Sequence, residues 1–166
     1  MNYKRKRRIV EKLKLIAEPG SHAILVTRDF DAPRELVFRA YTDPTLIPQW
    51  WGPRSVTTSV DQMDVRKGGI WRFVQHDADG NAFAFNGVYH EILKPERIVH
   101  TFEFEAMAGH VLLETVTFED RGGKTTVNDL LVFQSVEARN GMIQSGMETG
   151  TAESWDRFEE LLRVMA

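Results

Sequence analysis

Three ionisable side chains occupy positions where the neighbouring pattern predicts apolar residues. His100, Glu114 and Asp129 each lie in a segment of alternating polar and apolar residues, on the face that carries the apolar side chains. A carboxylate that faces an apolar core destabilises the fold unless it is paired or hydrogen-bonded. The pattern therefore indicates a shifted strand register, a salt-bridged structural cluster, or a cavity in which water or a ligand meets these groups.

The chemistry open to these groups is general acid–base catalysis or the orientation of a ligand. Burial raises the pKa of a carboxyl group, which is how a buried acid becomes a useful base. Tyr89 lies in another strand-like segment and could add a hydrogen-bond donor. It is equally consistent with a core aromatic residue whose hydroxyl group bonds the backbone.

Other kinds of site find no support in the sequence. There are no cysteines, which excludes disulfides, thiolate catalysis and cysteine-ligated metals. The five histidines form no HExxH motif, and there is no GxSxG, P-loop or GxGxxG motif. We therefore assign no catalytic residue, no metal and no cofactor. A net charge of −3 gives no basic field for nucleic acid, and no apolar run is long enough to span a membrane, so we expect a cytoplasmic protein.

The elements that position these groups are mostly strands. An apolar, β-branched run predicts a strand at 23–30. From 54 to 136 the pattern has period two, and turn residues such as Asp79-Gly80 and Gly122-Gly123 separate the runs. This predicts strands that pair antiparallel with their neighbours, at 54–63, 69–77, 82–93, 97–105, 110–119 and 124–135.

Helical patterns occupy the remaining segments. Pro33 and Asp43-Pro44 predict the starts of two short helices after the first strand, with Asp43 as an N-cap. Residues 137–165 predict a long C-terminal helix with one apolar stripe. Residues 3–17 predict a basic amphipathic helix ended by Pro19-Gly20, so we treat 1–20 as an N-terminal extension and 21–166 as the domain. The basic cluster is either a solvated face or a contact for anionic lipid or nucleic acid.

The stretch PQWWGP, residues 48–53, places two tryptophans side by side in a segment that its prolines keep irregular. Adjacent residues at a helix end point about 100° apart, so we do not expect both rings to enter one pocket. We predict that Trp51 faces the interior and that Trp50 lies at a rim or an intersubunit surface.

This layout predicts an α+β fold in which a curled seven-stranded antiparallel sheet surrounds the C-terminal helix. The inner face of the sheet is unusually aromatic. Those aromatic residues either fill a core or wall a cavity, and their volume alone does not decide between the two.

Several strings of the sequence resemble one known family. They are RDFDAPRELVFRAYTDPTLIPQWWGPRS, KGGIWRFV with the following DADG, GVYHEILKPERIVHTFEF, GGKTTV and SGMETGTAESWDRFEELL. In this order they resemble the activator of heat-shock-protein-90 ATPase homologue-like family, within the superfamily of START domains and polyketide cyclases (SRPBCC). The resemblance covers about residues 23–163.

The resemblance implies a helix-grip fold, a seven-stranded sheet around a long helix, with a cavity for apolar or amphipathic small molecules. It supplies no shared catalytic motif. The co-chaperones of the family resemble this chain only in their C-terminal domain, and no counterpart of their chaperone-binding domain is present, so direct chaperone activation is not expected.

We expect a START-like domain that binds a small apolar or amphipathic molecule, in stress response or detoxification. The residues expected to line its site are Trp51, Trp71, Phe73, Tyr89, His100, Phe102, Glu114, Asp129, Phe133, Met147 and Trp155. One alternative is an enzyme of cyclase, aromatase or hydrolase type, because folding a polyketide chain needs mainly shape, one base and one donor. Another is a protein-interaction module, either co-chaperone-like or a homodimer.

Overall fold

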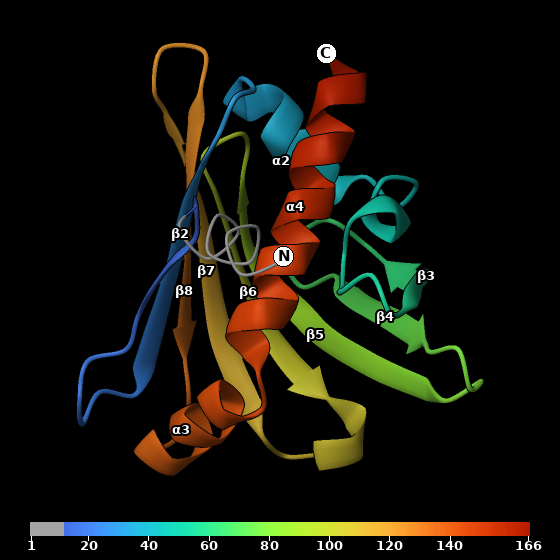
Figure 1. Ribbon diagram of the computed structural model, residues 1–166, viewed down its shortest axis with the longest axis vertical. Coiled ribbons are helices and arrows are strands. Elements are labelled where there is room, and N and C mark those ends of the chain that lie inside the picture. Colours follow the sequence, from blue (N-terminus) through green and yellow to red (C-terminus); the bar gives the residue numbers. More distant parts are fainter. Residues whose placement is uncertain (1–11) are drawn as a thin grey trace, which may run out of the picture.

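The computed structural model describes residues 12–166, which form a curled antiparallel sheet with helices on its concave side (Figure 1). The order of strands in the sheet is β1-β2-β8-β7-β6-β5-β4-β3. The strands are β1 (Lys14–Ile16), β2 (Ala23–Phe30), β3 (Thr57–Met63), β4 (Ile70–His76), β5 (Ala82–Leu93), β6 (Arg97–Phe104), β7 (Val111–Asp120) and β8 (Thr125–Val132).

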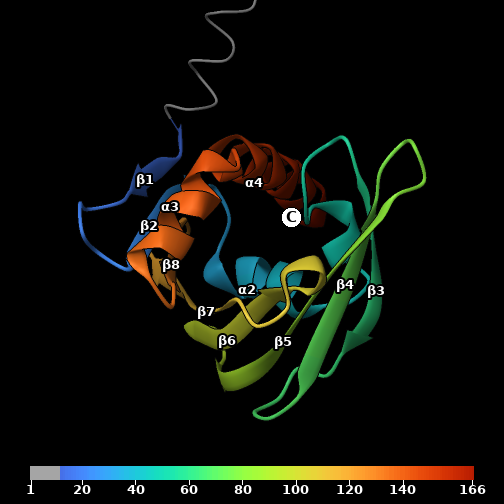
Figure 2. The same cartoon turned by 90° about the horizontal axis from the view of Figure 1, so that it is seen from below.

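The helices lie between β2 and β3, between β6 and β7, and after β8. They are α2 (Arg34–Thr42), the 3-10 helices η1 (Ile47–Gln49) and η2 (Glu105–Met107), α3 (Val136–Gln144) and α4 (Met147–Met165). Figure 2 shows α4 across the open side of the curl, with α2 at its far end. This is the predicted α+β helix-grip architecture, and the predicted antiparallel pairing of strands β3 to β8 is confirmed.

The sheet has eight strands where the sequence predicted seven. The additional strand, β1, lies at 14–16, where we expected the end of a helix, and that prediction was wrong for these residues. Leu15 and Ile16 pair antiparallel with Val26 and Leu25 along the free edge of β2. In β1 the backbone groups of these residues hydrogen-bond to the edge of the sheet. A short isolated helix is only marginally stable in water, so the strand conformation is favoured here. The rest of the predicted N-terminal helix, at 3–11, lies outside the described residues.

Two further helix predictions need correction. Asp43 is the residue after α2 and not an N-cap: its Oδ1 accepts hydrogen bonds from N and Oγ1 of Thr45, at 2.9 and 2.6 Å, in a turn that leads to η1. The single C-terminal helix is two helices, α3 and α4. Gly146 separates them at φ 87°, a left-handed conformation that glycine adopts without strain.

A buried ion-pair cluster fixes α4 against the sheet. Arg28 on β2 donates to Asp156 at 2.8 Å and to Glu159 at 3.1 Å, and both acceptors lie on α4. Its guanidinium group also lies 5.1 Å from the centre of the Phe30 ring. The sequence analysis did not identify this cluster.

The two tryptophans of PQWWGP are placed the opposite way from our prediction. Trp50 is 3% exposed, and its Nε1 donates to the carbonyl oxygen of Ala40, at 3.0 Å, near the end of α2. Trp51 is only half-buried and packs edge-on against Phe73 and Phe85. The turn of η1 points Trp50 into the junction of α2 and α4, so Trp50 is the anchor of this segment.

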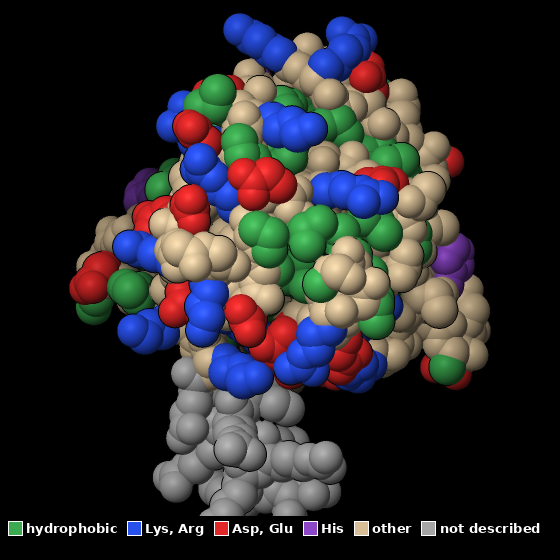
Figure 3. Space-filling view, turned by 90° about the horizontal axis from the view of Figure 1, so that it is seen from above, with side chains coloured by type: hydrophobic (Ala, Val, Ile, Leu, Met, Phe, Trp, Pro, Cys, Tyr) green, Lys and Arg blue, Asp and Glu red, His purple; other side chains and the backbone are tan. Residues whose placement is uncertain are grey.

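The charged surface has no single sign at the end of the molecule that carries the C terminus. Figure 3 shows Lys and Arg side chains next to Asp and Glu side chains across that face. None of the helices found over residues 12–166 has both the length and the apolar character needed to cross a bilayer.

Candidate functional site

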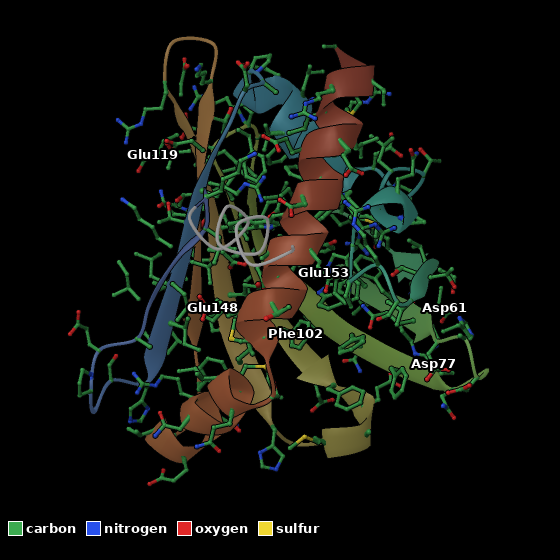
Figure 4. The ribbon with its side chains drawn as sticks, viewed as in Figure 1. Asp61, Asp77, Phe102, Glu119, Glu148 and Glu153 are labelled. Atoms are coloured by element: carbon green, nitrogen blue, oxygen red, sulfur yellow. The ribbon has the colours of Figure 1, made fainter. Side chains whose placement is uncertain are left out.

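A cavity of about 300 Å³ lies between the concave face of the sheet and α4. In Figure 4, Phe102 projects from the sheet, and Glu148 and Glu153 project from α4. Many aromatic residues line the cavity: Tyr41, Trp50, Trp51, Trp71, Phe73, Tyr89, Phe102 and Trp155. The space between sheet and helix is therefore not completely filled by side chains. Both tryptophans of PQWWGP border it, so the expectation that they would not share one pocket was wrong.

A row of polar side chains crosses the inner face of the sheet beneath this cavity. The strand registers pair Tyr89 on β5 with His100 on β6, and His100 with Glu114 on β7. Asp129 on β8 pairs with Val116, two residues along from Glu114 on the same face. A diagonal neighbour on a sheet is within reach of a longer side chain. Pairing of the strands thus gathers four groups that are far apart in sequence.

His100 and Glu114 contact each other across β6 and β7. Nδ1 of His100 lies 2.9 Å from the carbonyl oxygen of Thr101, which only accepts, so Nδ1 carries a hydrogen. Nε2 lies 3.2 Å from Oε2 of Glu114. Because a neutral Nε2 and an ionised carboxylate are both acceptors, the contact is favourable only when one of them holds a proton.

Asp129 is the deepest carboxyl group of the row. Burial is the main cause that raises its pKa well above the usual range, and the charge of Glu114 and a hydrogen bond with it add to the rise. Its Oδ1 is fully buried and has no hydrogen-bond partner. Burial and the neighbouring carboxylate thus favour the protonated form of Asp129.

Two tyrosines flank the carboxyl groups. Burial raises the pKa of Tyr41, and the negative charges of Asp129 and Glu114 raise it further. Burial also raises the pKa of Tyr89, which is 5% exposed. Both hydroxyl groups are therefore neutral donors at physiological pH. Together with the carboxyl pair they provide hydrogen-bonding groups in an otherwise apolar space.

The lining has an uneven charge. Of the described residues that border the cavity, Glu114, Asp129 and His100 can carry charge, and none is Lys or Arg. No group of three or more His, Asp and Glu residues in the described part of the chain is arranged to hold a metal ion. The arrangement can accept hydrogen bonds or a positive charge from a bound molecule, and it can supply an acid–base pair.

The model of the family described as "Activator of Hsp90 ATPase homolog 1-like protein" matches residues 31–163. The chain belongs to this family. This match confirms the family inferred from the sequence strings. The helix-grip fold of this family is associated with ligand binding.

Solved structures from several bacteria have the same fold. A protein from Rhodobacter sphaeroides is 24% identical, with a TM-score of 0.85 over 92% of this chain and 99% of that one. A protein from Arthrobacter aurescens is 22% identical, with a TM-score of 0.84 over 90% and 91% of the two chains. A protein from Staphylococcus epidermidis is 28% identical, with a TM-score of 0.77 over 90% and 94%. No functionally curated protein matches this chain.

In the present protein, ten of the eleven predicted site residues line the cavity. The exception is Phe133, which is buried but does not line the cavity. The chain leaves the sheet after Val132, so Phe133 lies past the end of β8, where its backbone N–H donates to the carbonyl oxygen of His22 at 2.9 Å. Phe133 is buried, as its place in the alternating pattern predicted, but the strand ends at Val132 and not at residue 135 as expected.

Four polar residues that line the cavity were not predicted: Tyr41, Gln75, Thr151 and Ser154. Tyr41 follows Val37 by four residues on α2 and therefore lies on the buried stripe of that helix. That spacing could have identified Tyr41. Gln75 and Ser154 carry no comparable signal, because their positions depend on how the 50–53 segment packs against β4 and α4.

Proposed function

We propose that this protein binds a small apolar or amphipathic molecule in the cavity between the sheet and α4. The observation that carries the proposal is a cavity of about 300 Å³ with aromatic walls and a few convergent polar groups. Small-molecule sites have this composition, and their volumes begin at about 300 Å³. A cytoplasmic location and a role in stress response or detoxification are part of the proposal.

The size of the cavity limits the ligand. A volume at the lower end of the usual range suits a molecule with two or three fused rings, or a short chain, and not a sterol. Native mass spectrometry of the purified protein would reveal a retained molecule. A thermal-shift screen with small aromatic compounds would supply binders: a ligand at one hundred times its Kd stabilises by about 2.7 kcal/mol. For a domain of this size, that raises Tm by about 5–11 °C.

A matched pair of glycine substitutions tests where binding occurs. Gly150 on α4 lines the cavity, and a Cβ built there meets no atom within 4 Å. Gly150→Leu should therefore direct its side chain toward open space at the cavity and weaken binding without destabilising the fold. The control is Gly141→Leu on α3. A Cβ at Gly141 also meets no atom within 4 Å, but Gly141 does not line the cavity.

Binding that survives in Gly150→Leu at full affinity would contradict the proposed location. A screen without any stabilising compound, together with an empty cavity by native mass spectrometry, would contradict the function itself.

One observation favours an enzyme as a second candidate. Asp129 has a raised pKa beside Glu114, an arrangement in which one carboxyl group can act as a base while the other shares its proton. If the cavity hosts a cyclase, aromatase or hydrolase reaction, Asp129→Asn and Glu114→Gln should abolish turnover of a substrate that both variants still bind. A substrate processed equally by wild type and both variants would exclude this role.

A third candidate, self-association, is favoured by apolar side chains on the convex face. Leu113 and Val132 are cross-strand partners, and Ile16, Leu113, Leu130 and Val132 are 37–44% exposed. Light scattering after size exclusion would give the mass in solution. A monomer at all concentrations would exclude a homodimer.

A further inference from the structure

We propose that the molecule bound in this cavity carries a positively charged amino group, which lies between Glu114 and Asp129 and is covered by the aromatic walls. This inference rests on the proposed ligand-binding function and names the chemical class of the ligand.

The first support is the lack of positive charge around the cavity. Among its described lining residues there is no Lys or Arg. The nearby Arg157 of α4 is engaged outside it, donating to the carbonyl oxygens of Gly52 at 2.9 Å and of Pro48 and Pro53 at 3.4 Å. A carboxylate or phosphate ligand would thus meet two carboxyl groups, and the lining group that could offset its charge, His100, is already in contact with Glu114 at 3.2 Å. Burial of such an anion is strongly unfavourable, which argues against fatty acids and other organic acids.

The second support is an unused acceptor. Asp129 Oδ1 is buried and accepts no hydrogen bond, although buried polar atoms in folded proteins are nearly always satisfied. The neighbouring Glu114 makes a single ion-pair contact, with Nε2 of His100. An ammonium group has two or three N–H donors, which suits two carboxyl groups on adjacent strands. Salt-bridged hydrogen bonds of this kind are stronger than those of a neutral donor.

The third support is the aromatic enclosure. Trp71, Trp155 and Tyr41 line the same cavity as the carboxyl groups. Trp71 lies 5.6 Å from His100, ring centre to ring centre, and Tyr41 is near enough to Asp129 and Glu114 for their charges to shift its pKa. The faces of aromatic rings attract cations, and an amine between carboxylates and indole rings gains from both.

Binding of a cation should release a proton. In the empty cavity, burial and the charge of Glu114 favour a protonated Asp129. An ammonium group placed there favours the ionised carboxylate, so the carboxyl proton leaves to solvent as the amine binds. The other titratable groups that face Asp129 are Glu114 from β7, His100 from β6, Tyr89 from β5 and Tyr41 from α2; β2, β4 and α4 border the cavity only with groups that do not titrate.

Three probes that differ only in their head group test the inference: naphthylethylamine, naphthylethanol and naphthylacetic acid. Isothermal titration with the wild-type protein should show the amine binding about tenfold more tightly than the alcohol, with the acid weakest. Titration of the amine in buffers of different ionisation enthalpy should show proton release, and titration of the alcohol should not.

Asp129→Asn and Glu114→Gln should each reduce the preference for the amine while leaving affinity for the alcohol within about threefold. The control is Glu119→Gln. Glu119 is also on β7 but projects outward near the β7–β8 hairpin (Figure 4), where it pairs with Arg121. Its substitution should leave all three affinities unchanged.

The outcomes separate the inference from the function on which it rests. If the alcohol binds but the amine is no better, or the acid binds as well as the amine, the inference fails and the ligand-binding function stands. An amine preference that persists in both carboxyl variants also overturns the inference. If none of the three probes binds, both the amine site and an aromatic ligand cavity are refuted.

Discussion

Replacement of Trp50 by alanine should be among the most destabilising single changes in this protein. Its ring is 3% exposed and packs against Tyr41 at 4.7 Å and Phe158 at 4.6 Å between ring centres. Its Nε1 also satisfies the Ala40 carbonyl oxygen, one of the last carbonyls of α2. Trp50 therefore connects the end of α2, the middle of α4 and the η1 turn.

The expected loss follows from these contacts. Removal of a fully buried tryptophan side chain costs about 3–5 kcal/mol, which for a domain of this length lowers Tm by about 6–20 °C. Trp50→Phe retains most of the ring but leaves the Ala40 carbonyl oxygen without this donor, which costs about 1–3 kcal/mol. The difference between the two variants separates packing from hydrogen bonding.

Urea unfolding followed by circular dichroism gives the free energy of unfolding for each variant. Trp51→Ala is the matched comparison, because the adjacent ring is half-buried and should cost about 1–3 kcal/mol. A loss in Trp51→Ala equal to or greater than that in Trp50→Ala would refute this assignment of the anchor. Trp51 borders the cavity, so its removal should also change binding.

Two other changes have clear expected outcomes. Gly87→Ala should lower the free energy of unfolding by at least about 1–3 kcal/mol, because the new Cβ collides with the carbonyl oxygen of Thr101 and with Nε1 of Trp71. In the control, Gly141→Ala, the new Cβ meets no atom, so this variant should be neutral or stabilising. Thermal unfolding of both variants measures the difference. Asp129→Asn should gain stability relative to wild type as pH rises. Burial and Glu114 raise the pKa of Asp129 in the folded protein above its value of about 4 in the unfolded chain. The protonated form therefore stabilises the wild-type fold at low pH, and this contribution is lost as pH rises from about 4 through the raised pKa. Asparagine does not titrate, so the variant loses nothing over this range. A stability difference that stays constant or shrinks over that range, measured by urea unfolding, would contradict the assignment.

The strands and the polar row were predictable because both depend on period-two alternation. Glu114 and Asp129 could be assigned to the inner face from their own segments, and short hairpin turns bring those segments side by side. Which apolar residues border free space was not predictable to the same degree. Phe133 shows why: its face is the one expected, but its distance from the cavity depends on where β8 ends.

Features that depend on tertiary packing escaped the sequence analysis. The β1 segment carries a helical pattern, yet pairing with the edge of β2 decides its conformation. The roles of Trp50 and Trp51 depend on the direction in which η1 turns the chain. Arg28 reads as an exposed strand residue until Asp156 and Glu159 approach it from α4.

The left-handed Gly146 divides the C-terminal region into two helices, each with its own anchor on the rest of the fold. Arg28 holds α4 to the sheet from one side of this joint, whereas α3 contributes Met142 to the cavity lining from the other. Met147 and Gly150, the first α4 residues to border the cavity, follow the joint directly. On the α3 side of the joint, the buried Arg139 donates to the carbonyl oxygens of Glu18 and Ala23, ahead of and at the start of β2, so α3 has its own anchor. A side chain at position 146, where φ is 87°, would thus strain the joint between two separately anchored segments that border the cavity, and would leave both anchors in place.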